Sequence, residues 1–142
     1  MNKSNTALRI IAGLVGAAAG YLIVGHLLHP ANDAAHFEKA LTDVASDMNK
    51  TLPMVVDGET RLDSTVPGPG LKFTYIYTLL KHDKSELDIP SLEKSLKPKI
   101  VANYKTSPEM KQFRDMNVEL DYQYKDKNGE YLFEISVTPA DF

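Results

Sequence analysis

Residues 60–80, TRLDSTVPGPGLKFTYIYTLL, decide the fold of this chain. In residues 60–66 every second residue is apolar or uncharged. The Pro-Gly-Pro-Gly segment at residues 67–70 interrupts this alternation, which then resumes with larger side chains. Alternation with a period of two is typical of a strand with one buried face. The stretch therefore predicts a β-hairpin. The side chains predicted to share one face are Thr60, Leu62, Ser64, Val66, Leu71, Phe73, Tyr75, Tyr77 and Leu79.

A second hairpin is predicted near the C-terminus, on either side of the turn dipeptide Asn128-Gly129. Two hairpins with alternating patterns indicate an antiparallel sheet of about four strands with a single buried face. We therefore expect an α+β fold, a two-layer domain in which helices cover the sheet. The alternating positions of the second hairpin are Val118, Leu120, Tyr122, Tyr124, Tyr131, Phe133, Ile135 and Val137.

Helices are predicted before and between the hairpins. An amphipathic segment over residues 37–52 ends before Pro53. A second helix begins at the N-cap Asp88 and is expected to kink or break at Pro98. A short third helix begins at Ser107.

The N-terminal part of the chain differs from the rest, because no charged side chain occurs from Ile10 to Leu28. This run is just long enough to cross a bilayer core, which takes about 20 residues. We expect residues 10–28 to form an uncleaved transmembrane signal-anchor helix. The alternative is a signal peptide cleaved near Ala17-Ala18-Ala19.

The charges that flank this run predict its orientation. Lys3 and Arg9 precede it, and the next cation is Lys39. Because positive charge is retained in the cytoplasm, residues 1–9 should be cytoplasmic and residues 30–142 should form an exported, periplasmic domain. The expected location is the inner (cytoplasmic) membrane, with a single span.

Composition excludes several classes of function. The net charge is -3, whereas nucleic-acid-binding proteins carry an excess of basic residues. The chain has no cysteine, so disulfides, thiolate metal sites and cysteine nucleophiles are excluded.

Three segments between Thr51 and Pro139 carry a resemblance: TLPMVVDGETRLDSTVPGPGLKFTYIYTL, TSPEM and VELDYQYKDKNGEYLFEISVTP. In this pattern the chain resembles small bacterial envelope proteins of unknown function that have an N-terminal apolar segment or lipoprotein signal. Proteins of that kind often have one cysteine before the SPEM-like turn and another at the C-terminal end. The resemblance implies an envelope location and, in this cysteine-free chain, a C-terminal strand held by packing alone.

Two candidate sites lie in or near the apolar run. A stripe of small residues with GxxxG spacing would let a second helix approach closely, either a second copy or a partner span; it consists of Ala12, Gly16 and Gly20. Four possible metal ligands follow, namely His26, His29, Asp33 and His36. An uninterrupted helix would bring these four to one face, where they could hold Zn²⁺. Pro30 interrupts such a helix, so anchoring at the membrane interface is the alternative.

The first hairpin offers further candidates for contact with a partner or ligand: Asp57, Glu59, Arg61, Asp63, Tyr75 and Tyr77. Carboxylates beside an arginine can grip a ligand or carry out acid–base chemistry. They can equally form a solvated strand face with paired charges. The tyrosines fit a core, or an aromatic pocket between sheet and helices.

The sequence contains neither a nucleophile elbow nor a phosphate-binding glycine loop. We therefore expect a single-span, membrane-anchored periplasmic interaction or accessory protein without catalytic activity or cofactor. Its expected partners are the lipid bilayer and a protein of an envelope complex, or a second copy through the transmembrane helix. The alternative is a tethered periplasmic domain that binds a small molecule or a metal.

Overall fold

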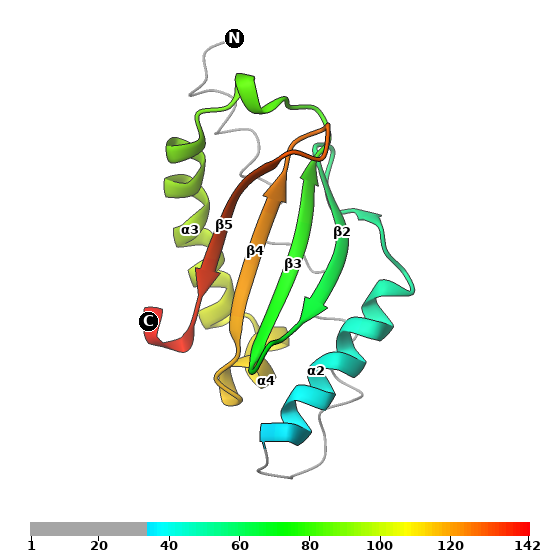
Figure 1. Cartoon of the computed structure of the whole chain (residues 1–142). Coiled ribbons are helices and arrows are strands. Elements are labelled where there is room, and N and C mark those ends of the chain that lie inside the picture. The colour runs from blue at the N-terminus through cyan, green and yellow to red at the C-terminus, as the bar shows by residue number, and fades with distance from the viewer. Residues whose placement is uncertain (1–33) are drawn as a thin grey trace.

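The computed structural model describes residues 34–142 (Figure 1). The predicted signal-anchor, its small-residue stripe and the predicted cleavage site lie outside the described residues. No helix within residues 34–142 is long and apolar enough to cross a membrane. The elements are α2 (Ala34–Asn49), β1 (Met54–Val55), β2 (Thr60–Pro67), β3 (Lys72–Leu79), α3 (Ile89–Thr106), α4 (Lys111–Asp115), β4 (Glu119–Lys125) and β5 (Tyr131–Val137), with 3-10 turns at Lys84–Glu86, Pro108–Met110 and Pro139–Asp141.

The sheet has five strands in the order β1-β2-β3-β4-β5, and it is mixed. The prediction of about four antiparallel strands is therefore wrong in two respects. The two-residue strand β1 pairs with β2, and β4 runs parallel to β3. The parallel pair arises because the connection between them contains α3, and such a crossover returns the chain to the end of the sheet where β3 began. The two predicted hairpins, β2–β3 and β4–β5, are present.

A β-bulge in β2 changes which side chains face the core. The register with β3 shifts between Leu62 and Ser64. After the shift Thr65 is buried at 2% exposure and Val66 is 44% exposed. The prediction that Ser64 and Val66 share the face of Leu62 is therefore wrong, since one extra residue in a strand reverses the alternation beyond it.

The side chain of Asn49, the last residue of α2, occupies the outer edge of β2. Its amide nitrogen donates to the Thr65 carbonyl at 2.9 Å, and its oxygen accepts from the Thr65 backbone N–H at 2.8 Å. One amide thus satisfies the backbone donor and acceptor that a neighbouring strand would otherwise pair. The Asn49 amide thus covers the outer backbone of β2 directly after the bulge.

The helices cover one face of the sheet at its two margins. α2 packs on β2, and α3 packs on β5, with the strands of the opposite face open to view in Figure 1. The core between the layers is continuous and includes the predicted inner face of each helix. Its members from α2 and α3 are Leu41, Val44, Ala45, Met48, Leu92, Leu96, Ile100 and Tyr104.

The predicted cap of α3 is present, because the Asp88 carboxylate accepts from the Ser91 backbone N–H at 3.3 Å. The expected break at Pro98 is absent, and the helix runs through it to Thr106. Proline removes one internal hydrogen bond. Buried side chains on both sides of Pro98, such as Leu96 and Ile100, keep the two halves of the helix on the sheet.

A buried carboxylate ties the crossover connection to the β4–β5 turn. Asp126, only 1% exposed, accepts from the backbone N–H groups of Asn128 at 2.8 Å, Glu130 at 2.9 Å and Lys84 at 3.1 Å. Burial alone would raise the pKa of Asp126. The hydrogen bonds from Glu130, Lys84 and Asn128 outweigh this effect and hold the pKa below its ordinary value.

Candidate functional site

The four charged candidates of the first hairpin do not converge on one site. Asp57 accepts from the backbone N–H groups of Glu59 at 2.7 Å and Thr60 at 2.8 Å, so this carboxylate closes the turn before β2. The Glu59 carboxylate lies 3.3 Å from Nε2 of His82, which belongs to the loop after β3. Both side chains thus stabilise the end of the sheet.

The structure does bring Arg61 and Asp63 together. The Arg61 Nε donates to one oxygen of Asp63, and the Thr78 hydroxyl donates to the other, each at 2.5 Å. Lys72, on the neighbouring strand, pairs with Glu119 and with the buried Asp121 at 3.2 Å each. Both groups are paired charges on the sheet face that the helices leave open, and such pairs contribute modestly to stability.

The tyrosines are part of the core. Tyr75 and Tyr77 are 0% and 7% exposed. In the parallel neighbour β4, the ring of Tyr122 lies 5.2 Å from that of Tyr75 at a tilt, and the ring of Tyr124 stacks on that of Tyr77 at 5.3 Å. Burial raises the pKa of all four hydroxyls, so they stay protonated at physiological pH. A ligand can therefore reach these rings only by displacing the layer that covers them.

The candidate metal ligands His26, His29 and Asp33, and the stripe of Ala12, Gly16 and Gly20, lie outside the described residues. His36 lies in the first turn of α2, with its ring 6.2 Å from that of Phe37. Within residues 34–142, no three His, Asp or Glu side chains are placed to hold a metal ion.

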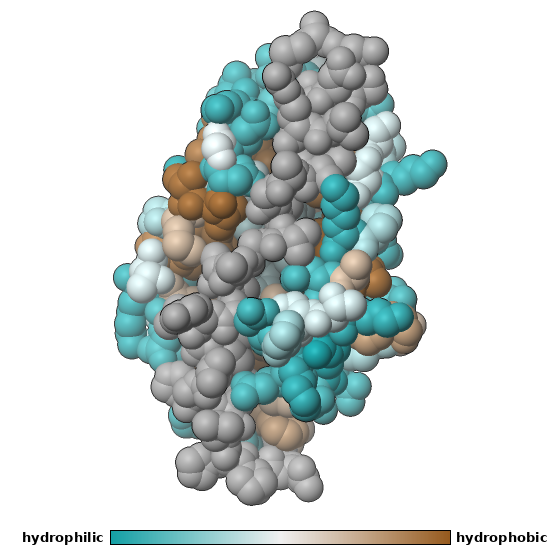
Figure 2. All heavy atoms as spheres, turned by 180° about the vertical axis from the view of Figure 1, so that it is seen from behind, coloured by the Kyte–Doolittle hydropathy of each residue, from teal (hydrophilic) through white to brown (hydrophobic). Residues whose placement is uncertain are grey.

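One margin of the sheet presents an apolar surface. Met54 and Val55 form β1 and are 37% and 60% exposed. Figure 2 shows a brown patch at the upper left, on the side of the molecule where Figure 1 places this strand. Exposed apolar side chains on an edge strand are suited to contact with another protein.

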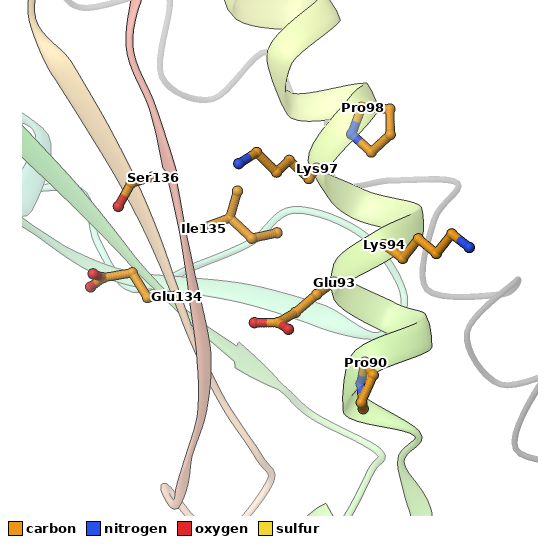
Figure 3. A pocket seen from close by; sticks show the side chains of 8 residues that line it. All are labelled: Pro90, Glu93, Lys94, Lys97, Pro98, Glu134, Ile135 and Ser136. Atoms are coloured by element: carbon orange, nitrogen blue, oxygen red, sulfur yellow. The ribbon is translucent and has the colours of Figure 1, made fainter. Parts of the chain in front are cut away.

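The other margin carries a groove between α3 and β5 with a volume of about 690 Å³ (Figure 3). Glu93 and Lys97 extend from the helix toward the strand, and Ile135 extends from the strand toward the helix. Glu134 and Ser136, which are exposed on the opposite face of β5, also line the groove. The remaining lining residues are Pro90, Lys94 and Pro98.

Sequence reasoning missed this groove, because its charged residues occupy the outer positions of an amphipathic helix. Glu93 and Lys97 have the pattern of an ordinary solvated face. Only the sheet order, which makes β5 the outermost strand, places that face beside backbone that no strand of residues 34–142 pairs. The one unusual feature of this segment in the sequence was Pro98, which lies inside the helix and in the wall of the groove.

Three solved structures share the fold. The pilotin EpsS of the Vibrio vulnificus type 2 secretion system has a TM-score of 0.58 and 13% identity, with 75% of this chain and 92% of that chain covered. The type II secretion pilotin AspS of Vibrio cholerae has a TM-score of 0.57 and 13% identity, with 77% and 94% covered. A candidate secreted protein of Pseudomonas aeruginosa has a TM-score of 0.62 and 11% identity, with 77% and 95% covered.

At identities this low, the likeness establishes a common fold. None of the curated proteins matches the sequence. The sequence profile of one family, described as a domain of unknown function (DUF8479), matches residues 36–133, which is most of the α+β domain. The chain therefore belongs to this family.

Proposed function

We propose that the protein is a non-catalytic accessory subunit of a bacterial envelope complex, and specifically that it binds a protein component of a secretion system. The observation that carries the proposal is the fold, which is shared with two type II secretion pilotins over about three-quarters of the chain. The exposed apolar strand β1 and the groove beside β5 supply surfaces for a protein partner.

A membrane tether is part of the proposal. The uncharged run from Ile10 to Leu28, preceded by Lys3 and Arg9, favours a single span with the α+β domain in the periplasm. The small-residue stripe in that run would serve a second role, as a contact for a partner span. Each of these assignments rests on the sequence.

The charged side chains of the first hairpin are held in hydrogen bonds and ion pairs, which favours a binding function over catalysis. In the first hairpin, Asp57 closes a turn, Asp63 accepts from Arg61 and Thr78, and Glu59 contacts His82. A general base needs a free carboxylate beside a cleft that admits substrate. In the groove beside β5, the carboxylates of Glu93 and Glu134 lie with the cations of Lys94 and Lys97, and such a mixture of charges suits contact with another polypeptide.

Cross-linking tests the partner. Tagged full-length protein is treated with an amine-reactive cross-linker in intact cells and purified from membranes in mild detergent. We expect an equimolar adduct with a component of an envelope secretion complex, identified by mass spectrometry. An unrelated single-span protein with the same tag is the control. A monomer without adducts would contradict the proposal.

Reporter fusions test the tether. A reporter fused after Phe142 should be active only in the periplasm. In a matched variant, Lys3→Gln and Arg9→Gln remove the leading cations while Asn32→Lys and Asp33→Lys add two after the run, and the orientation should reverse in a measurable fraction of molecules. A cytosolic wild-type reporter, or a mature protein that begins beyond Ala19, would overturn the assignment.

A further inference from the structure

The two edges of the sheet differ in how their backbone is covered. At the other margin, the two-residue strand β1 is outermost and pairs with Leu62 and Arg61 of β2, and the Asn49 amide pairs with Thr65 beyond β1. At the β5 edge, no strand or side chain among residues 34–142 pairs with the outward backbone. An open edge presents a row of N–H and C=O groups that can pair with another extended chain.

The groove follows that open edge. Ile135 faces the helices and is buried, whereas Glu134 and Ser136 face the opposite side and are exposed. Residues from both faces of one strand can line the same groove only where the groove passes along the edge of the strand. α3 runs beside β5 and forms the second wall (Figures 1 and 3).

Three charged residues of α3 line the groove, and Lys94 is the one whose side chain extends away from β5 (Figure 3). Glu93 and Lys97 are one turn apart and both extend toward β5 (Figure 3). Neither has an ion-pair partner among the described residues, although Lys97 helps to lower the pKa of Asp141. Four residues of helix rise about 6 Å, and two residues of strand span about 6.7 Å. An added strand would therefore place residues i and i+2 opposite the two charges.

We propose that the β5 edge accepts an extended segment of a partner protein as a sixth strand, with a cationic and an anionic side chain two positions apart facing Glu93 and Lys97. The inference rests on the proposed function, since it names the surface that the partner would use. Backbone pairing with β5 supplies affinity, and the two charges supply selectivity.

A partner segment fits this edge better than a second copy of β5. In a symmetric antiparallel pair of β5 strands centred on the middle of the strand, Glu134 of one copy lies opposite Glu134 of the other. Like charges directly opposite each other destabilise a strand pair. A segment with charges of both signs avoids this conflict and meets Glu93 and Lys97 with opposite charges.

Peptide binding tests the proposal on the full-length protein in detergent micelles. Three acetylated, amidated peptides are compared, TVKVEVT, TVKVKVT and TVEVEVT, together with the proline-interrupted TVKPEVT. Hydrogen exchange followed by mass spectrometry should show protection of residues 131–137 with TVKVEVT. This peptide should bind about three- to tenfold more tightly than either single-sign peptide, because each single-sign peptide replaces one attractive charge pair with a repulsive one. TVKPEVT should bind weakly.

Charge variants make the test specific. Lys97→Glu should transfer the preference to TVKVKVT, and Glu93→Lys should transfer it to TVEVEVT. Lys39→Glu, an exposed position on α2 with the same change of charge, should leave the preference unchanged. All three positions are on helix surfaces, so the fold is expected to survive, and circular dichroism checks this.

Three outcomes would overturn the inference. These are a lack of protection at residues 131–137 with every peptide, a preference that ignores the variants, and protection without peptide that rises with protein concentration, which would indicate a second copy at this edge. If cross-linking identifies a secretion component while the peptides leave β5 unprotected, the proposed function stands and this surface is wrong.

Discussion

The ring of Phe142, the last residue, meets the ring of Tyr104 edge-on, with centroids 5.8 Å apart and planes at 89°. The Nζ of Lys105 lies 5.9 Å from the centre of the same Phe142 ring. The contact joins the C-terminal end to the segment just before Ser107-Pro108. An aromatic contact thus links the two segments here without a covalent bond.

Phe142→Ala should destabilise the protein by about 1–2 kcal/mol, because the edge-to-face contact and part of the buried apolar area are lost. The value is moderate since Phe142 is 43% exposed. Urea unfolding of the full chain in micelles measures it. Phe142→Leu keeps apolar area but loses the aromatic edge, so it should lie between wild type and Phe142→Ala. Equal stability of all three proteins would show that the contact is not stabilising.

Removal of a tyrosine hydroxyl should have opposite effects at two buried positions. The Tyr104 hydroxyl donates to the Val118 carbonyl at 2.7 Å, whereas the Tyr75 hydroxyl has no hydrogen-bond partner among the described residues. Tyr104→Phe should therefore cost about 1 kcal/mol, and Tyr75→Phe should leave stability unchanged or raise it by up to about 1 kcal/mol. Urea midpoints compare the two. A loss at Tyr75 equal to that at Tyr104 would contradict the view that the Tyr75 hydroxyl is unpartnered.

Asn49→Ala should destabilise the protein by about 1–3 kcal/mol, because the Thr65 backbone loses both its donor and its acceptor partner. Exchange of the Thr65 amide hydrogen should accelerate as well. Asn103→Ala is the matched control, a half-buried asparagine near the end of α3 whose side-chain amide makes no hydrogen bond among the described residues. If the two variants behave alike, the bracket at the edge of β2 contributes nothing.

Acid should weaken the fold partly through Asp126. The pKa of this group is lower in the folded state than its ordinary value of 3.8, so its stabilising effect is complete above that value and is lost as the pH falls through the lower, folded value. Asp126→Asn should therefore be less stable than wild type at pH 7, and the difference should shrink toward pH 3. Urea midpoints across this range measure the effect. A difference between the two proteins that stays constant from pH 7 to pH 3 would contradict this assignment.

Local patterns predicted the elements of this fold well. The spacing of Leu41, Val44 and Met48 predicted α2, and the alternation around Tyr75 and Tyr122 predicted strands of both hairpins. The relative direction of the hairpins was not predictable in the same way, because alternation along a strand is identical whether its neighbour runs parallel or antiparallel. The helix between them was the available signal for a parallel crossover.

Long-range contacts account for the other errors. The side-chain reversal at Thr65 comes from the bulge between Leu62 and Ser64, and the Thr65 backbone pairs with the amide of Asn49, which lies sixteen residues away and carries no local pattern. The strand β1 is too short, at two residues, for periodicity to reveal it. The groove beside Glu93 requires knowledge of which strand is outermost. Its residues alone resemble any solvated helix surface.

The unequal edges of the sheet limit how many molecules can join. Growth into a fibril requires that every molecule carry two complementary surfaces, so that each surface can pair with the other one on the next molecule. Because the Asn49 amide already occupies the backbone N–H and C=O of Thr65, these two groups cannot pair with a strand of another molecule. A second copy that offered its β5 edge could therefore not pair with the Thr65 segment of β2, which removes one route to a head-to-tail array.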